Sequence, residues 1–440
     1  MIGYEGNRKM LNDNLQINKA GHLTICGADT VLLAKQYGTP LYVMDENKIR
    51  SICRMYKKSI EQCYGGNGLP LFASKAFCCK EICRIMKEEG MGLDVVSGGE
   101  LYTAMQAGFP AEKIQFHGNN KTPDEISYAL TSGVGHFVVD NLAELELLDE
   151  ISGKLHKNAN ILLRIKPGID AHTHKFIRTG QIDSKFGFAL ETGEAMEAAK
   201  AAVQADHLTL LGMHCHIGSQ IFEIQPFELA AKVMLGFIRD VKKETGVELH
   251  ELNLGGGFGI RYTDKDQPVP YDSYMEKVSQ TVHCCCEEYL LSLPKIYIEP
   301  GRSIVGEAGL TLYTIGSVKQ IPNIRTYVSV DGGMTDNPRY ILYQSEYEAV
   351  VANKANQPAD YKVTIAGRCC ESGDLIQEGT YIQHCVPGDL LAVLSTGAYN
   401  YSMASNYNRV PRPAVLFVKD GVPRVAVRRE SYDDLVRNDI

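Results

Sequence analysis

The stretch LPLFASKAFCCKEICRIMKEEGMGLDVVSGG, residues 69–99, indicates the fold of the larger part of this chain. Its first seven residues form an apolar run that ends in a lysine. Residues 80–89 then carry apolar side chains at helical spacing, and residues 92–99 form a second apolar run that ends in glycines. A strand, a helix and another strand in this order predict a β-α-β unit with parallel strands.

The same alternation continues along the chain. Six more strand-like runs bring the number to eight, and they lie at 114–119, 136–141, 161–168, 208–218, 252–257 and 295–301. Eight strands with helical patterns between them predict a (β/α)8 TIM-like barrel, although a doubly wound sheet uses a similar alternation.

The pattern changes after about residue 302. Short β-rich runs separated by turn residues predict a C-terminal β-sandwich or β-barrel domain. We therefore expect an N-terminal segment 1–41 that packs with the β domain, a barrel over 42–302 and the β domain over 303–440.

The composition limits the class of protein. Of the 440 residues, 44% are hydrophobic and 22% are charged, which is typical of a soluble globular protein. The formal net charge of -8 disfavours a nucleic-acid partner, and no apolar run of about 18 residues predicts a membrane span. The thirteen cysteines include adjacent ones and follow no secretory signal, so we expect reduced thiols and a cytoplasmic protein.

Polar residues and glycines follow the predicted strands, and in a (β/α)8 barrel the chemistry lies at these strand ends. Lys75 ends the first run. A partly desolvated lysine there favours the neutral amine, which attacks an aldehyde to form a Schiff base. A lysine that points into solvent is the alternative, and position alone favours it.

Two other strand ends carry residues that suit a flat anionic ligand. The glycines at 255–257 can let backbone N–H groups approach a phosphate, although a tight barrel turn uses the same residues. Glu299 can hold a protonated pyridine nitrogen, or it can pair with the nearby Arg302.

The histidines do not predict a metal site. His214 and His216 alternate on one strand and so point to opposite faces, and we expect no metal even with His172 and His174 nearby. We interpret His216 as a ring that stacks on a flat cofactor and His214 as a structural histidine.

Motifs from about residue 39 to about residue 413 resemble the fold-type III pyridoxal-phosphate decarboxylases, most of all those that act on diaminopimelate. The motifs occur in the order of that family and are FASKA (72–76), DVVSGGEL (94–101), VVDN (138–141), RIKPG (164–168), SKFGF (184–188), HCHIGSQ (214–220), LNLGGGFGI (252–260), IEPGRSIV (298–305), VDGGMTDNPRY (330–340), CESGD (370–374) and GAYNYSMASNYN (397–408).

The resemblance implies a role for each matched position. Lys75 is the lysine that binds pyridoxal 5'-phosphate covalently, Cys370 donates a proton, His216 stacks on the cofactor ring and Glu299 partners its nitrogen. The implied cofactor contacts are Lys75, Asp94, Arg164, His216, Ser219, Gly256, Gly257, Glu299, Gly301, Arg302 and Tyr399. The implied substrate contacts are Arg302, Arg339, Tyr343, Glu371 and Tyr399.

The resemblance also implies the reaction, which is the decarboxylation of meso-2,6-diaminopimelate to L-lysine and carbon dioxide. Arginines suit the distal carboxylate of this substrate, and Glu371 suits its distal ammonium. In this family the CESGD segment comes from the neighbouring subunit, which implies a homodimer with shared active sites.

The chain departs from the family pattern at two places. Phe77 stands where the family usually has asparagine, and Cys369 adds a second thiol beside Cys370. Cys370 is our choice for the proton donor because it directly precedes the Glu-Ser-Gly-Asp segment.

Three other functions use the same scaffold. A decarboxylase for D-ornithine, D-lysine or arginine would not need Arg302, Arg339 and Tyr343 in their matched positions. A racemase and a non-catalytic pyridoxal-phosphate carrier are disfavoured by the C-terminal domain that carries Cys370.

Overall fold

The computed structural model describes residues 10–169 and 183–440, which form two compact units. The first, which we call the barrel unit, contains residues 52–259 and 268–301. The second, which we call the β unit, contains the residues up to Ser51, residues 260–267 and residues 302–440.

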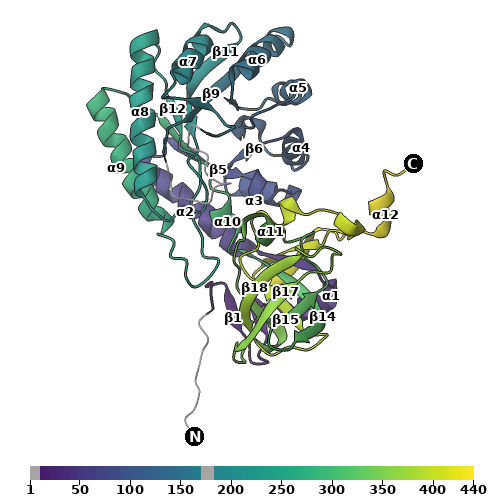
Figure 1. The fold of residues 1–440 in the computed structure, drawn as a ribbon. Coiled ribbons are helices and arrows are strands. Elements are labelled where there is room, and N and C mark those ends of the chain that lie inside the picture. The colour runs from purple at the N-terminus through teal and green to yellow at the C-terminus, as the bar shows by residue number, and fades with distance from the viewer. Residues whose placement is uncertain (1–9, 170–182) are drawn as a thin grey trace. The chain divides into compact units, whose positions relative to one another are not determined.

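The barrel unit confirms the predicted (β/α)8 architecture (Figure 1). Its eight parallel strands close in the order β5-β6-β7-β8-β9-β11-β12-β13, and β13 pairs with β5. The strands are β5 (Gly68–Ala73), β6 (Gly92–Val95), β7 (Ile114–Phe116), β8 (His136–Val139), β9 (Ala159–Lys166), β11 (Leu208–Cys215), β12 (Glu251–Asn253) and β13 (Lys295–Ile298). A short strand, β10 (Phe188–Ala189), adds to the edge of β9.

Helices alternate with these strands, because the segments between the apolar runs carry apolar residues on one face and polar caps at their ends. They are α2 (Glu46–Tyr64), α3 (Lys80–Glu88), α4 (Gly98–Gln106), α5 (Pro123–Ser132), α6 (Leu142–Lys154), α7 (Glu194–Gln204), α8 (Gln225–Thr245) and α9 (Tyr271–Tyr289). No helix in the described part of the chain has the length and apolar character that crossing a membrane requires.

The β unit is built around a mixed sheet in the order β18-β17-β15-β14-β4-β20-β21. Its strands are β4 (Leu41–Asp45), β14 (Gly309–Ile321), β15 (Arg325–Val330), β16 (Ala349–Val351), β17 (Tyr361–Ala366), β18 (Leu375–Ile382), β19 (Leu390–Val393), β20 (Ala414–Lys419) and β21 (Val422–Val427). Strand β19 pairs with β14 and β16. Three short helices, α10 (Arg302–Val305), α11 (Arg339–Tyr343) and α12 (Tyr432–Val436), belong to the same unit.

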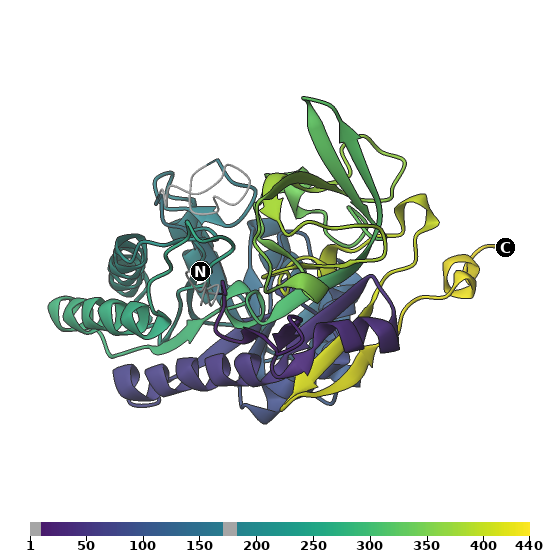
Figure 2. The ribbon, with the colours of Figure 1, turned by 90° about the horizontal axis from the view of Figure 1, so that it is seen from below.

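The N-terminal segment packs into this unit. It forms a small sheet of β1 (Leu15–Ile17), β2 (Leu23–Ile25) and β3 (Ala28–Asp29), followed by α1 (Thr30–Tyr37). Its apolar residues share one core with residues of β14, β19 and β20. In Figure 2 the yellow C-terminal strands lie beside purple N-terminal residues of the same unit.

The boundary that we expected at residue 42 is displaced. Strand β4 pairs with β14 on one side and with β20 on the other, so it belongs to the β unit rather than to the barrel. Residues 260–267 also cross to the β unit, where Ile260 and Tyr262 enter its second core. Both differences arise because a strand or loop joins the sheet that satisfies its backbone and apolar side chains, whatever its place in the sequence.

A buried ion pair holds two loops at the carboxyl ends of β7 and β8. Lys121 Nζ lies 2.6 Å from Glu144 Oε1 and donates to the carbonyls of Gly118 and Val138 at 3.0 and 2.8 Å. Burial raises the pKa of Glu144, and the nearby Lys121 opposes that shift. The pair therefore ties the loop before α5 to the first turn of α6.

Lys121→Met should lower the free energy of unfolding by roughly 3–5 kcal/mol, because it leaves a buried carboxylate without its cation. Urea unfolding of the purified protein measures this change. Lys154→Met is the matched control, since Lys154 pairs with Glu150 on the exposed face of α6 and its loss should cost below about 1 kcal/mol. Equal losses for the two variants would contradict the role given to Lys121.

Candidate active site

Lys75 lies in the barrel unit, directly after the first barrel strand. It is the middle residue of a single 3-10 turn, Ser74–Ala76, whose other two side chains are buried. The Lys75 side chain is half-buried, and no hydrogen bond or ion pair joins it to another described residue. Asp94 and His216 are close enough to interact with its charge. The amine thus lies at the end of β5 without a hydrogen-bond or ion-pair partner in the part of the chain that the structure describes.

Glu299 follows β13 and is surrounded by side chains from three other strands. His214 Nε2 lies 3.2 Å from Glu299 Oε2, and Asn253 Nδ2 donates to Oε1 at 2.7 Å. His117 Nε2 lies 3.0 Å from the same Oε1. Burial by itself raises the pKa of Glu299, but His117 and His214 outweigh it and hold this pKa well below the usual range. The barrel therefore holds a buried carboxylate anion.

His216 and the glycine run lie next to this carboxylate. The Gly256 N–H donates to His216 Nδ1 at 3.2 Å, and burial holds the pKa of His216 well below its usual range. The ring is therefore flat and neutral. A Cβ atom on Gly256 would lie 2.1 Å from the Glu299 carbonyl oxygen, and one on Gly257 would lie 2.5 Å from that of Gly218. Only glycine fits at these two positions.

Two further predicted cofactor contacts extend from neighbouring strands of the barrel. Asp94 is buried on β6, its Oδ1 has no hydrogen-bond partner among the described residues, and burial raises its pKa. Arg164 on β9 lies 3.8 Å from Asp140 through its Nε and stacks on Phe186, with 4.3 Å from Cζ to the ring centre. A buried carboxyl group and a guanidinium group thus line the barrel, and no ion pair joins these two described residues.

Two other predicted positions, Gly301 and Ser219, also lie in the barrel unit. A Cβ atom on Gly301 would lie 2.9 Å from the Cβ of Ala73, so the chain after Glu299 packs directly on the end of β5. Ser219 lies in the segment between β11 and α8.

The structure bears on the metal question at one place only among the described residues. His172 and His174, the histidines near the predicted site, lie outside the described residues. His117, His214 and Glu299 are grouped closely enough to hold a cation, but their nitrogen and oxygen atoms already contact one another.

The β unit brings together a cluster of two buried arginines and tyrosines, which we call the arginine cluster. Arg339 donates to the Tyr262 hydroxyl at 2.7 Å, to that of Tyr347 at 3.3 Å and to Ser345 Oγ at 3.2 Å. Arg302 donates to the same Tyr262 hydroxyl. Burial favours the neutral phenol, but the two guanidinium groups outweigh it and lower the pKa of Tyr262.

The remaining predicted substrate contacts of the β unit have different surroundings. Tyr399 lies against both arginines, with its ring centre 4.7 Å from Arg302 Cζ and 5.7 Å from Arg339 Cζ. The Tyr343 ring centre lies 5.7 Å from Arg339 Cζ. Glu371 is exposed and lies in the loop between β17 and β18. The structure therefore joins Arg302, Arg339, Tyr343 and Tyr399 in one cluster, which does not include Glu371.

The two candidate thiols differ in their environment. Cys370 is exposed, and its N–H donates to Asn408 Oδ1 at 2.7 Å. Cys369 is half-buried beside Asp374, and burial together with that carboxylate raises the pKa of Cys369 to about 11. Of the two thiols, Cys370 is the one that presents its side chain outward.

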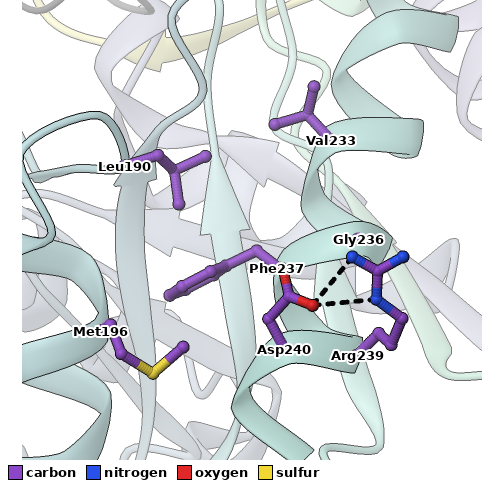
Figure 3. A pocket seen from close by; sticks show the side chains of 7 residues that line it. All are labelled: Leu190, Met196, Val233, Gly236, Phe237, Arg239 and Asp240. Carbon is purple, nitrogen blue, oxygen red and sulfur yellow. Dashed lines mark hydrogen bonds and ion pairs between the residues drawn. The ribbon is translucent and has the colours of Figure 1, made fainter. Parts of the chain in front are cut away.

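A separate hollow of about 390 Å³ lies on the outside of the barrel between β10, α7 and α8 (Figure 3). Its lining residues are Leu190, Met196, Val233, Gly236, Phe237, Arg239 and Asp240. The two charged residues are already paired, with 2.9 Å from Arg239 Nε to Asp240 Oδ1. The hollow is therefore lined by apolar groups and a satisfied ion pair, and it offers no reactive group.

Sequence reasoning missed several residues of these clusters. The sequence predicts a structural role for His214 but does not indicate that its Nε2 contacts Glu299. Asn253 and Tyr262 were not singled out. Asn253 could have been found, because it is a buried polar residue at a strand end inside the LNLGGG motif. Tyr262 had no local signal, since it follows the GFGI turn as an ordinary aromatic residue.

The barrel residues fit pyridoxal phosphate. Glu299 supplies an anion for a ring N–H, and His216 supplies a flat neutral ring. Lys75 supplies an amine that no other described residue binds, and the glycines supply a backbone that no side chain obstructs. The family described as Pyridoxal-dependent decarboxylase, pyridoxal binding domain, matches residues 46–306. Fold, site and family match thus define the class as pyridoxal-dependent decarboxylases, with pyridoxal 5'-phosphate as cofactor.

Similar proteins narrow the class. The chain is 49% identical over 423 residues to a diaminopimelate decarboxylase of Bacillus subtilis, with 96% of each chain covered. It is 51% identical over 425 residues to a diaminopimelate decarboxylase of Halalkalibacterium halodurans, with 97% of each covered. A solved diaminopimelate decarboxylase from M. jannaschii, in complex with L-lysine, superposes with a TM-score of 0.89 at 34% identity, covering 98% of this chain and 99% of that one.

This chain belongs to the diaminopimelate decarboxylase family. A solved lysine/ornithine decarboxylase from Vibrio vulnificus shares the fold at a TM-score of 0.74 and 22% identity.

Proposed function

We propose that this chain decarboxylates meso-2,6-diaminopimelate to L-lysine and carbon dioxide, as its family indicates. The observation that carries the choice of substrate is Arg339. It is buried, its hydrogen-bond partners are the hydroxyl groups of Tyr262, Tyr347 and Ser345, and no described carboxylate lies within ion-pair distance of it. A buried guanidinium that contacts hydroxyl groups and no described carboxylate is suited to a ligand carboxylate, which accepts its charged hydrogen bonds.

The chemistry of the substrate agrees with the arginine cluster. Diaminopimelate carries an amino acid group at each end, so one end can react while the distal carboxylate remains to be recognised. In this proposal Arg302 and Arg339, next to Tyr343 and Tyr399, bind that distal carboxylate. Ornithine, lysine and arginine lack this second carboxylate.

We assign the remaining roles as follows. When bound, pyridoxal phosphate supplies an electron sink for the electron pair left by the departing carbon dioxide. Lys75 is its covalent attachment point, and Glu299 keeps a proton on the ring nitrogen. His216 stacks on the ring face, while Asp94 and Arg164 line the pocket. Ser219, Gly256, Gly257, Gly301, Arg302 and Tyr399 are the remaining proposed contacts of the phosphate and the cofactor.

The protonating group comes from a second copy of the chain in this proposal. Cys370 of the partner subunit delivers a proton to the α-carbon, and Glu371 of the partner subunit binds the distal ammonium. The exposure of both side chains in the single chain supports this assignment. The protein is then a homodimer with two shared sites.

The cysteines bear on the cellular compartment. The thirteen free cysteines agree with a reducing compartment, and we place the enzyme in the cytoplasm.

The reaction is tested by carbon dioxide release from meso-diaminopimelate, D-ornithine, D-lysine and L-arginine at equal concentrations. We expect release from diaminopimelate alone at a substantial rate. Fast release from one of the others, with none from diaminopimelate, would overturn the assignment.

Arg339→Met should lower kcat/KM for diaminopimelate by about 100-fold, because hydrogen bonds from a charged donor to a carboxylate are lost. The weak turnover of D-lysine, which has no distal carboxylate, should hardly change, so the preference between the two substrates should collapse. Steady-state kinetics with both substrates measure this. Arg325→Met is the control, since Arg325 lies in the same unit and pairs with Glu378 at 2.5 Å on the surface. A uniform loss on both substrates would refute the carboxylate contact.

A further inference from the structure

The surroundings of Glu299 suggest a role for two histidines that the proposed reaction has not used. His117 follows β7, His214 lies on β11 and Asn253 ends β12, so three strands each direct one polar group at the carboxylate that follows β13. All four side chains are at most 6% exposed. The rings of His117 and His214 meet edge to face, with centres 4.9 Å apart. Each ring therefore restricts the orientation of the other.

The hydrogen bonds define the protonation of His214. Its Nδ1 is buried and has no hydrogen-bond partner among the described residues, while its Nε2 lies 3.2 Å from Glu299 Oε2. A proton on Nδ1 would be a buried unsatisfied donor, so the ring carries its proton on Nε2 and donates it to the carboxylate. Burial lowers the pKa of His214 to about 4, which makes this a neutral donor.

His117 occupies a different position, between two carboxylates. Its Nε2 lies 3.0 Å from Glu299 Oε1 and 3.8 Å from Asp94 Oδ1. The pKa of Asp94 is raised by burial, whereas that of Glu299 is held low by the two histidines. His117 lowers the pKa of both carboxyl groups, but only Glu299 also has His214 beside it. Other titratable or charged groups among the described residues also face this cluster, and they are Lys75, Glu100, Arg164, Cys215 and His216.

We propose that His117 and His214 are positioning residues that keep Glu299 ionised and so keep the cofactor ring nitrogen protonated. This inference rests on the proposed pairing of Glu299 with that nitrogen. A buried carboxylate without donors takes up a proton, since burial disfavours the charged form. A neutral carboxyl group cannot hold a pyridinium, and the ring would then withdraw electrons less strongly.

The first test reads Glu299 in protein from which the cofactor has been removed. Infrared spectroscopy detects the C=O stretch of a protonated buried carboxyl group. We expect no band from Glu299 in the wild type at neutral pH and a clear band in the double variant His117→Leu, His214→Leu. Adding Glu299→Gln to the double variant should remove the band, which assigns it. A double variant without the band would overturn the proposal.

The second test asks whether the histidines act through the ring nitrogen. Each variant is loaded with pyridoxal phosphate or with the deaza analogue, in which carbon replaces the ring nitrogen. His117→Leu and His214→Leu should each lower kcat about 10-fold with the natural cofactor. With the analogue, the two variants and the wild-type protein should have about the same kcat. Equal losses with both cofactors would mean a structural role and would overturn the proposal.

Two matched variants separate chemistry from folding. His214→Gln keeps an N–H near the position of Nε2 and should retain near wild-type kcat; a loss as large as that of His214→Leu would contradict the donor role. His136→Leu removes the histidine of another pair, which lies 2.9 Å from Glu251 at the opposite end of the barrel strands. It should lower the melting temperature without producing the carboxyl band.

Failure of the underlying pairing has its own signature. The wild-type protein and the Glu299→Gln variant are each compared with the natural cofactor and with the analogue. If the analogue lowered the activity of both proteins by the same factor, Glu299 would not pair with the ring nitrogen. The role proposed for Glu299 would then be wrong. The infrared band of the double variant does not depend on the cofactor, so it still reports whether the histidines keep Glu299 ionised.

Discussion

Lys75→Ala is expected to abolish covalent attachment of pyridoxal phosphate and to lower decarboxylation by about 10⁴-fold or more, as removal of a nucleophile does in other enzymes. The reason lies in the position of the amine. It is half-buried on a one-turn segment whose neighbours Ser74 and Ala76 are buried, so no other described lysine can take its place at the end of β5. The carbon dioxide assay measures the loss.

Attachment is measured independently of activity. Borohydride reduction of the holoenzyme followed by peptide mass spectrometry should place the cofactor on Lys75. Lys80→Ala is the matched control, because Lys80 is an exposed lysine at the start of α3, five positions further along the chain. It should keep both the label and the activity. A Lys75→Ala protein that retained both would refute the central assignment.

Cys370→Ala is expected to lower kcat by about 10²- to 10⁴-fold, because it removes the general acid that protonates the α-carbon. Cys369→Ala should change kcat little. The Cys369 thiol is half-buried beside Asp374, and its pKa of about 11 makes it a poor match for proton transfer near neutral pH. Parallel kinetics on the two single variants decide between the adjacent thiols.

Mixing the two inactive proteins tests whether the sites are shared. A hybrid of Lys75→Ala and Cys370→Ala subunits contains one site with both residues intact if Cys370 acts across the interface. Random reassortment of equal amounts should then restore about a quarter of the wild-type activity, because half of the dimers are hybrids with one working site. No recovery after verified subunit exchange would show that each site uses its own Cys370.

Much of the fold could be predicted because its signals are local. Each barrel strand is a short apolar run buried on both faces, and each of the eight runs expected from the sequence overlaps one observed strand. Strand β4 has the same texture and cannot be assigned in this way. Its backbone pairs with β14 and β20, which lie far away in the sequence, so its unit depends on partners that no local pattern indicates.

The same division holds for the site. The sequence by itself determined the positions of Lys75, Glu299 and the glycine run, because each follows a strand whose end is visible in the apolar pattern. The tertiary structure alone decided that His117, His214 and Asn253 surround Glu299, and that Tyr262 joins Arg302 to Arg339. These contacts form between segments distant along the chain. Their effect on charge depends on burial and on hydrogen-bond geometry, which exist only after the strands have closed into a barrel and the β unit has packed.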